Sequence, residues 1–270
     1  MRLSRLAALA SALVLSTALV ACGGGDDADT DGAASSDATA SAPTGEITVL
    51  GAASLTEAFG ELKTTFESEN DGATVNLSFD SSSVLAEQVV QGNPADVLAT
   101  ADENTMKTVT DADLAAGEPV VFASNTLVVV TPPDNPADID SIDDLGQDGS
   151  TFAVCVVDAP CGAASKRLLD LDEVTAQPST EEQNVKGVLT KVTLGEVDAG
   201  LVYASDAQAA GDDVTVIEPE NADQAVNLDP IVVLKDAENP ELAQAWVDLV
   251  TGAEGQKVLA SYGFQPAPAA

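Results

Sequence analysis

The feature that most constrains the fold is an alternation, from Glu46 onward, of short apolar runs with amphipathic segments. The runs Ile47–Leu50 and Asn125–Val130 are rich in β-branched residues, which is typical of buried strands. The segment 54–68 repeats apolar residues every three or four positions, as a helix with one buried face does. This strand–helix rhythm predicts an α/β fold with mostly parallel sheets flanked by helices.

The rhythm is interrupted near residue 125 and again near residue 228. We therefore predict two lobes, one formed by residues 46–125 and 228–270 and the other by residues 126–227, with two extended segments crossing between them. In folds of this class the ligand lies beside the C-terminal ends of strands and the N-termini of helices. The predicted ligand site is the cleft between the lobes.

The N-terminus has the pattern of an export signal. Arg2 and Arg5 precede an apolar stretch at 6–20, which is too short to span a membrane. We assign residues 1–21 to a signal peptide, because Leu-Val-Ala-Cys at 19–22 is typical of a bacterial lipobox and predicts lipid attachment at Cys22. An ordinary signal peptide followed by an unrelated cysteine is the alternative.

Residues 22–45 are rich in Gly, Ser and Asp, and they contain no apolar run. Such a segment buries too little surface to offset its ordering entropy, so we expect a flexible acidic tether. Together, signal and tether predict an exported domain outside the cytoplasmic membrane, anchored as a lipoprotein at its outer face.

The charge excludes several classes of function. The chain has 45 acidic and 10 basic residues, a formal net charge of −35, and no histidine. Nucleic acid needs clustered Lys and Arg and is not an expected partner. Without histidine there is no Ser-His-Asp arrangement, and neither a Gly-x-Ser-x-Gly elbow nor a P-loop is present. We therefore predict that the chain is not an enzyme and has no cofactor.

Two cysteines remain after Cys22. Cys155 and Cys161 lie six positions apart across a turn that contains Pro160, and in an exported protein this predicts a disulfide. A metal-binding pair is the rival interpretation, but the sequence has no histidine or second Cys-x-x-Cys to complete it. We expect no direct protein ligand to a metal.

Two serine-rich turns indicate an anion site. Ser54 and Ser82 each lie between a strand-like run and a helix-like run, where unpaired backbone N–H groups and the helix dipole favour an anion. Ser54 also has capping-box spacing to Glu57, so simple helix capping is the alternative. The turns before 161 and 185 open two further helices, and Tyr203 ends a strand, where its hydroxyl could either donate to a ligand or be satisfied within the core.

Over about residues 46–270 the sequence resembles the molybdate-binding lipoproteins of bacterial ABC importers. The resemblance rests on motifs in a specific order, namely Ala53–Thr56, Phe79–Ser83, Pro94–Val97, Asn125–Val130, Gly195–Ala207 and Gly255–Phe264.

The resemblance implies a two-lobed type II periplasmic-binding fold that closes over one tetrahedral oxyanion, molybdate or tungstate. It implies an oxyanion site made by Ser54, Ser82, Cys161, Val185 and Tyr203. It also implies delivery to an ABC permease and its ATPase. We expect a monomer.

Asp80 departs from the family pattern, because a small neutral residue is expected there. A carboxylate repels a dianion, so we expect Asp80 to face away from the ligand or to pair with a cation. Two other functions stay open at this point. One is a receptor for sulfate or another tetrahedral oxyanion, and the other is a lipoprotein hydrolase or sensor module built on the same fold.

Overall fold

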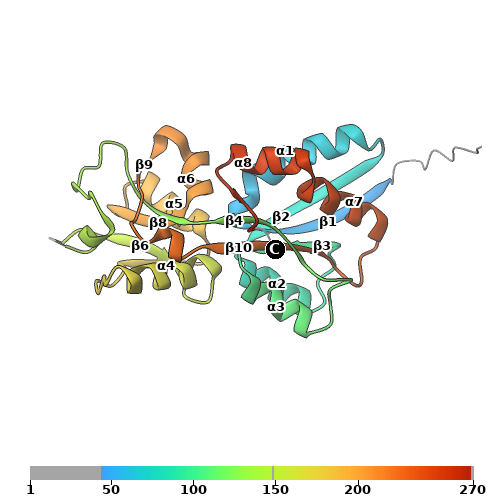
Figure 1. Ribbon diagram of the computed structural model, residues 1–270, viewed down its shortest axis with the longest axis horizontal. Coiled ribbons are helices and arrows are strands. Elements are labelled where there is room, and N and C mark those ends of the chain that lie inside the picture. The colour runs from blue at the N-terminus through green and yellow to red at the C-terminus, as the bar shows by residue number, and fades with distance from the viewer. Residues whose placement is uncertain (1–43, 148, 269–270) are drawn as a thin grey trace, which may run out of the picture. The chain divides into compact units, whose positions relative to one another are not determined.

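The structure is a computed structural model that describes residues 44–147 and 149–268 (Figure 1). The predicted signal peptide, Cys22 and the tether up to residue 43 lie outside the described residues. The chain forms an α/β fold with two sheets, each flanked by helices, as the strand–helix rhythm predicts. Within the described ranges, no helix combines the length and the apolar character needed to cross a bilayer.

Lobe 1 is built on a six-stranded sheet with the strand order β11-β4-β10-β3-β1-β2. Its strands are β1 (Gly45–Ala52), β2 (Ala73–Asp80), β3 (Val97–Ala99), β4 (Val120–Asn125), β10 (Asn227–Val233) and β11 (Gln265–Pro266). Helices α1 (Thr56–Glu69), α7 (Pro240–Thr251) and α8 (Ala253–Ser261) cover one face, and α2 (Ser82–Val90) and α3 (Glu103–Asp111) cover the other (Figure 1).

Aromatic packing fixes the helical layer of lobe 1. Trp246 of α7 is fully buried, and its ring lies edge-on to Phe59 and Phe66 of α1, with centroid distances of 5.5 Å in both pairs. Edge-to-face pairs of this kind stabilise a core beyond the area that they bury. Trp246 therefore anchors α7 to α1 in the core of lobe 1.

Lobe 2 is built on a five-stranded sheet with the order β7-β6-β8-β5-β9. Its strands are β5 (Leu127–Thr131), β6 (Phe152–Cys155), β7 (Thr180–Glu182), β8 (Ala199–Tyr203) and β9 (Thr215–Ile217). Helix α4 (Pro160–Leu171) lies on one face, and α5 (Val185–Thr193) and α6 (Ala204–Ala210) lie on the other (Figure 1).

The sheets are mixed, whereas the sequence predicted mostly parallel ones. Strand β1 runs parallel to β2 and β3, but β10 runs antiparallel to β3 and β4, and β5 runs antiparallel to β8 and β9. The reason is the crossing between lobes. The chain leaves lobe 1 through β4 and continues directly into β5, and it returns through β10, where Asn227 pairs with Asn125. A segment that leaves and one that returns run in opposite directions.

Candidate functional site

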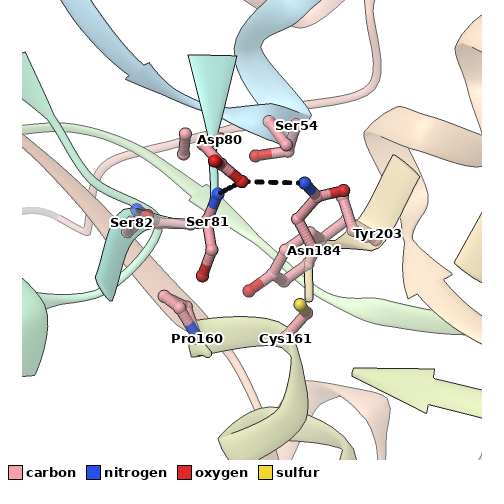
Figure 2. A pocket seen from close by; sticks show the side chains of 12 residues that line it. Ser54, Asp80, Ser81, Ser82, Pro160, Cys161, Asn184 and Tyr203 are labelled. Atoms are coloured by element: carbon pink, nitrogen blue, oxygen red, sulfur yellow. Dashed lines mark hydrogen bonds between the residues drawn. The ribbon is translucent and has the colours of Figure 1, made fainter. Parts of the chain in front are cut away.

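Four helix N-termini meet at one small cavity between the two sheets (Figure 2). From lobe 1 come the short turn that leads into α1 and the N-terminus of α2, and from lobe 2 come the N-termini of α4 and α5. The space open to the centre of a water molecule is about 10 Å³, which suits one compact group. Within the described part of the chain, no Lys or Arg lines the cavity. The lining residues are Ala52, Ala53, Ser54, Asp80, Ser81, Ser82, Ala101, Pro160, Cys161, Asn184, Val185 and Tyr203.

The first turn presents the hydroxyl of Ser54. Ser54 lies in the short 3-10 turn η1 (Ala53–Leu55), directly after β1, and its side chain is only 4 % exposed. Its Oγ has no hydrogen-bond partner among the described residues. A buried hydroxyl without a partner is costly, and a ligand oxygen in the cavity would satisfy it.

The alternative role of Ser54, a capping box with Glu57, is not what the structure shows. Helix α1 begins two residues later, at Thr56, and the Thr56 hydroxyl donates to the Ala53 carbonyl oxygen at 2.7 Å. The Glu57 carboxylate instead binds the Lys186 ammonium at 2.7 Å. The 3-10 turn rotates Ser54 away from the capping position and leaves its hydroxyl free for the cavity.

The second turn presents the hydroxyl of Ser82, the first residue of α2. Its Oγ accepts a hydrogen bond of 3.0 Å from the backbone N–H of Ala101 and is buried. A hydroxyl has one hydrogen and two lone pairs, so accepting this bond leaves the hydrogen available for a ligand. Through this bond, Ser82 holds Ala101, which lies between β3 and α3, at the cavity.

On the side of lobe 2, α4 begins at Pro160 and carries Cys161, which forms a disulfide with Cys155 at the end of β6. The predicted disulfide is thus present in the structure. Gly162 packs so tightly that a Cβ built there would lie 1.9 Å from the Val156 carbonyl oxygen. Only glycine permits this approach of helix to strand, which brings the N-terminus of α4 to the cavity.

Asn184 caps α5 and precedes the predicted ligand residue Val185. Its side-chain oxygen accepts a hydrogen bond of 3.1 Å from the backbone N–H of Gly187, which is a normal N-cap contact. The cap leaves the N–H of Val185 in the first turn of the helix without an intrahelical partner. Val185 itself is buried at the cavity.

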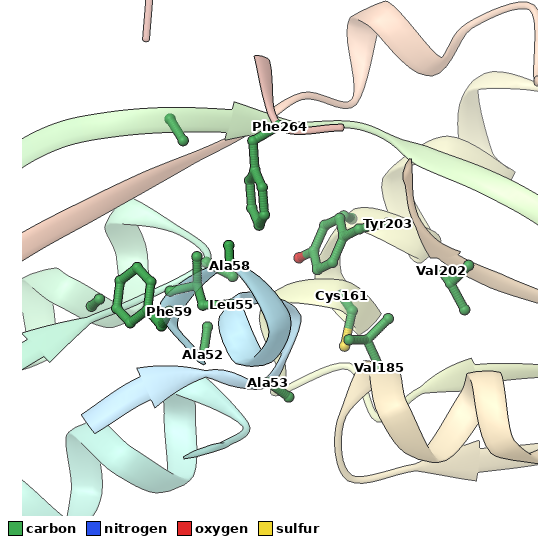
Figure 3. Close-up of a cluster of buried hydrophobic side chains, with 14 of the residues drawn as sticks. Ala52, Ala53, Leu55, Ala58, Phe59, Cys161, Val185, Val202, Tyr203 and Phe264 are labelled. Carbon is green, nitrogen blue, oxygen red and sulfur yellow. The ribbon is translucent and has the colours of Figure 1, made fainter. Parts of the chain in front are cut away.

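Tyr203 ends β8 among apolar side chains, including Leu55, Cys161 and Val185 (Figure 3). It is only 2 % exposed, and its hydroxyl oxygen accepts a hydrogen bond of 2.8 Å from the Asn227 side-chain amide. Burial, and then the negative charges of Asp229 and Asp102, raise the pKa of Tyr203 well above its usual value. The hydroxyl therefore keeps its proton at any physiological pH.

Asp80 lines the cavity and has no cationic partner among the residues that the structure describes, so the expectation for this residue is wrong. Its Oδ1 accepts hydrogen bonds from the Ser81 backbone N–H at 2.7 Å and from the Asn184 side-chain amide at 3.0 Å (Figure 2). Asp80 ends β2 in lobe 1, and Asn184 caps α5 in lobe 2. Neutral donors thus partly offset the carboxylate charge, and the same contact joins the two lobes.

Lys186 makes a second contact between the lobes. Its ammonium lies 2.7 Å from Glu57 of α1 and 3.0 Å from Asp206 of α6. Burial opposes its charge, but the two carboxylates, Asp206 first, outweigh burial and raise the pKa of Lys186. Burial raises the pKa of the fully buried Asp206 to about 6, even though Lys186 acts in the opposite direction.

Comparison with known proteins identifies the family. Residues 47–265 match the family model described as "Bacterial extracellular solute-binding protein". The chain belongs to this family. Its membership confirms the prediction that the chain is a binding protein rather than an enzyme.

Several relatives of this solute-binding protein carry a specific name. The "Molybdate-binding protein ModA" of Mycobacterium tuberculosis H37Rv is 41% identical over 262 residues, which cover 95% of each chain. The protein of the same name from Escherichia coli K12 is 33% identical over 234 residues. The alignment covers 82% of this chain and 89% of the E. coli protein.

Solved structures also share the fold. The periplasmic molybdate-binding protein of Azotobacter vinelandii superposes with a TM-score of 0.73 at 21% identity, covering 82% of this chain and 100% of its own. The sulfate-binding protein SubI of Mycobacterium tuberculosis H37Rv superposes with a TM-score of 0.72 at 18% identity. The superposition covers 82% of this chain and 87% of SubI. At such identities the likeness concerns the fold, and it confirms the two-lobed type II architecture.

The residues expected at the ligand site of this solute-binding protein all line the cavity between the two sheets. They are Ser54, Ser82, Cys161, Val185 and Tyr203. Sequence reasoning did not assign a role to Ala101 or Asn227, which hold the hydroxyls of Ser82 and Tyr203. Neither residue lies in a motif next to its partner, so no local signal marks it. Among the described residues, no group of three or more His, Cys, Asp or Glu side chains could hold a metal ion.

Proposed function

We propose that this protein captures molybdate outside the cytoplasm for import by an ABC transporter. The observation that carries the proposal is the cavity where four helix N-termini meet, with the buried Ser54 hydroxyl left without a partner among the described residues. Each of these termini offers unpaired backbone N–H groups and a partial positive charge. A compact anion satisfies such groups without any Lys or Arg.

The chemistry of molybdate suits a lining rich in neutral donors. At neutral pH it is a fully deprotonated dianion that only accepts hydrogen bonds. The hydroxyls of Ser82 and Tyr203 each accept a bond from the protein, which leaves their hydrogens for the ligand. Backbone N–H groups at Ser54, Ser82, Cys161 and Val185 complete the proposed set of donors.

The relatives named for molybdate, at 41% and 33% identity, support molybdate over other tetrahedral anions. Sulfate also accepts without donating, but it is smaller and would leave some donors unpaired, at a cost of about 1–3 kcal/mol each. Tungstate has nearly the size and charge of molybdate, and we propose that it binds as well.

The cellular setting completes the proposal. We propose that residues 1–21 are removed, that Cys22 carries a lipid anchor, and that residues 22–45 tether the domain. We further propose that residues 46–125 and 228–270 form one lobe and residues 126–227 the other, and that the monomer delivers its ligand to a permease and ATPase. The family description as an extracellular protein supports the location.

Calorimetric titration of the purified protein with molybdate, tungstate, sulfate and phosphate tests the function. We expect tight one-to-one binding of the first two anions only. If sulfate bound as tightly as molybdate, the proposed ligand would be tetrahedral oxyanions in general and not molybdate in particular. No binding of any of the four would refute the proposal. A turnover of ester substrates that depends on Ser54 would instead favour the hydrolase alternative.

A further inference from the structure

We propose that Asn227 and Arg167 are positioning residues that fix the direction of the Tyr203 hydroxyl, so that it acts only as a donor toward the ligand. The inference rests on the proposed function in one respect, namely that the ligand is an oxyanion. It concerns two residues that do not line the cavity.

The chain of contacts begins at Arg167 on α4. Its guanidinium donates to the Asn227 side-chain oxygen Oδ1 at 2.8 Å, and it also donates to the carbonyl oxygens of Ala225 at 3.2 Å and Val226 at 3.4 Å. It is the only arginine in the sequence after Arg5. A guanidinium cannot accept a hydrogen bond, so the atom of Asn227 that faces it must be the oxygen.

The orientation of Asn227 follows from this contact. Asn227 is the first residue of β10 and is 5 % exposed. With its oxygen held by Arg167, its amide nitrogen Nδ2 faces Tyr203 and donates to the hydroxyl oxygen at 2.8 Å. The same nitrogen also donates to the Pro160 carbonyl oxygen at 3.4 Å, so Arg167 and Pro160 together disfavour the half-turn that would offer the Asn227 oxygen to the tyrosine.

The hydroxyl of Tyr203 has one hydrogen, and the donor from Asn227 prevents that hydrogen from pointing at Asn227. In the described part of the chain this hydroxyl donates to no protein acceptor, and Tyr203 lines the cavity. The hydrogen is therefore available to the cavity alone. A donor held in this way favours an anion without protons and penalises one that must donate, such as hydrogen phosphate.

Asn227→Asp tests the inference, because the two side chains have nearly the same shape. The carboxylate accepts only, so Tyr203 would donate to it and would present lone pairs to the ligand. We expect molybdate affinity to fall by about 100-fold or more, because the cavity loses a donor and gains a nearby charge. Calorimetry gives the affinity, and thermal unfolding confirms that the variant is folded.

A double-mutant cycle with Tyr203→Phe separates the two causes. In the Tyr203→Phe background, Asn227→Asp adds the same charge but has no hydroxyl to redirect. We expect the effect of Asn227→Asp to shrink by about tenfold or more in that background. An equal loss of affinity in both backgrounds would overturn the inference, since charge alone would then explain it.

Arg167→Met provides a second variant at an exposed position, in case Asn227→Asp fails to fold. It removes the stronger of the two contacts that orient the Asn227 amide and leaves the 3.4 Å bond to the Pro160 carbonyl oxygen, so we expect molybdate affinity to fall several-fold while the Tyr203 hydroxyl is present. In the Tyr203→Phe background, which lacks that hydroxyl, Arg167→Met should leave the affinity unchanged. A loss that persists without the hydroxyl would contradict the positioning role.

A ligand-free measurement distinguishes this inference from the proposed function. The side-chain amide protons of Asn227 are observable by ¹⁵N-resolved NMR, and Tyr203→Phe removes the acceptor of one of them. We expect that proton to shift upfield in the variant. If no oxyanion binds but the proton shifts, the proposed function fails while the hydrogen bond stands. If the proton does not shift, the positioning inference is refuted even if molybdate binds.

Discussion

At the scale of single residues, the two serines of the cavity have the same expected role but different structural duties. Within the described ranges the Ser54 hydroxyl has no protein partner, whereas the Ser82 hydroxyl accepts from the Ala101 N–H. A ligand oxygen would be a partner for both. Only Ser82 also satisfies a buried backbone group of the protein itself.

Replacing each serine by alanine separates these duties. We expect Ser54→Ala and Ser82→Ala each to weaken molybdate binding by about 1.5–3 kcal/mol, the usual value of a hydrogen bond to a charged group. Only Ser82→Ala should also lower the free energy of unfolding of the ligand-free protein, by about 1–3 kcal/mol, because it leaves the Ala101 N–H unpaired. Calorimetry and urea denaturation measure the two quantities.

Ser68→Ala on α1 is a matched control, because Ser68 is exposed and does not line the cavity. It should change neither quantity. Unchanged affinity in Ser54→Ala would remove that hydroxyl from the ligand site. A large loss of stability in Ser54→Ala would show that its hydroxyl has a structural partner after all.

Asp80 is the one acidic residue in the cavity lining. Asp80→Asn keeps an oxygen that can accept from Ser81 and Asn184, but it removes a negative charge. We expect affinity for a dianion to rise by about tenfold at low salt, and the gain to decrease as salt increases. Titrations at two ionic strengths measure the effect.

Asp71→Asn, at an exposed position, changes the net charge equally and is the control. Its affinity should match that of the unmodified protein. If Asp80→Asn instead bound molybdate more weakly, the contact of the carboxylate with Asn184 would favour binding more than its charge opposes it.

At the scale of elements, the site is an arrangement of helix starts. The N-terminus of α4 reaches the cavity because Gly162 lies against Val156, and the adjacent Cys161 is bonded to Cys155 at the end of β6. The N-terminus of α5 reaches it because Asn184 caps the helix and also contacts Asp80. Covalent and hydrogen bonds at the first turn therefore orient each helix toward the ligand.

The disulfide should contribute to stability more than to recognition. We expect the double variant Cys155→Ser, Cys161→Ser to lose about 2 kcal/mol of unfolding free energy, since the closed loop is short. One-to-one molybdate binding should persist, because the expected donor at position 161 is a backbone N–H. Urea denaturation with and without dithiothreitol measures the stability.

The reductant provides an internal control, because it should affect the unmodified protein and leave the double variant unchanged. Loss of molybdate binding in a variant that remains folded would contradict the prediction. The sulfur bridge would then be needed to place the helix start itself.

At the scale of the whole molecule, negative charge dominates, with a formal net charge of −35. Within the domain, Lys186 lies between carboxylates of both lobes, and Asp206 and Asp229 are buried. Burial raises the pKa of Asp229 well above its usual value. Protonation of Asp206 and Asp229 therefore removes charges whose burial opposes folding.

Stability should accordingly increase on mild acidification. Burial raises the pKa of Asp206 to about 6 in the folded protein, against an ordinary value of 3.8, so the folded state binds the proton more readily. Its contribution to stability is complete below the lower value and is lost as the pH rises through the higher one. We expect the free energy of unfolding to rise by about 1–2 kcal/mol from about pH 7 to about pH 5.

Asp206→Asn tests the assignment, since it removes the titrating group. Denaturation curves across this pH range should show a smaller slope in the variant. An equal slope would assign the pH dependence to other carboxylates, such as Asp229 or the surface as a whole.

The sequence by itself determined the α/β class, most strand and helix positions and the serine turns, because apolar periodicity and turn residues act locally. It did not indicate β7, whose Thr-Glu-Glu sequence lacks an apolar pattern, or the mixed sheets, which follow from the chain crossing between lobes and returning. Only the tertiary structure decided that Ser54 is free of its capping box, that Asp80 contacts Asn184, and that Asn227 holds Tyr203. These contacts join residues 24 to 104 positions apart or depend on a turn that rotates one side chain, and no local pattern specifies such geometry.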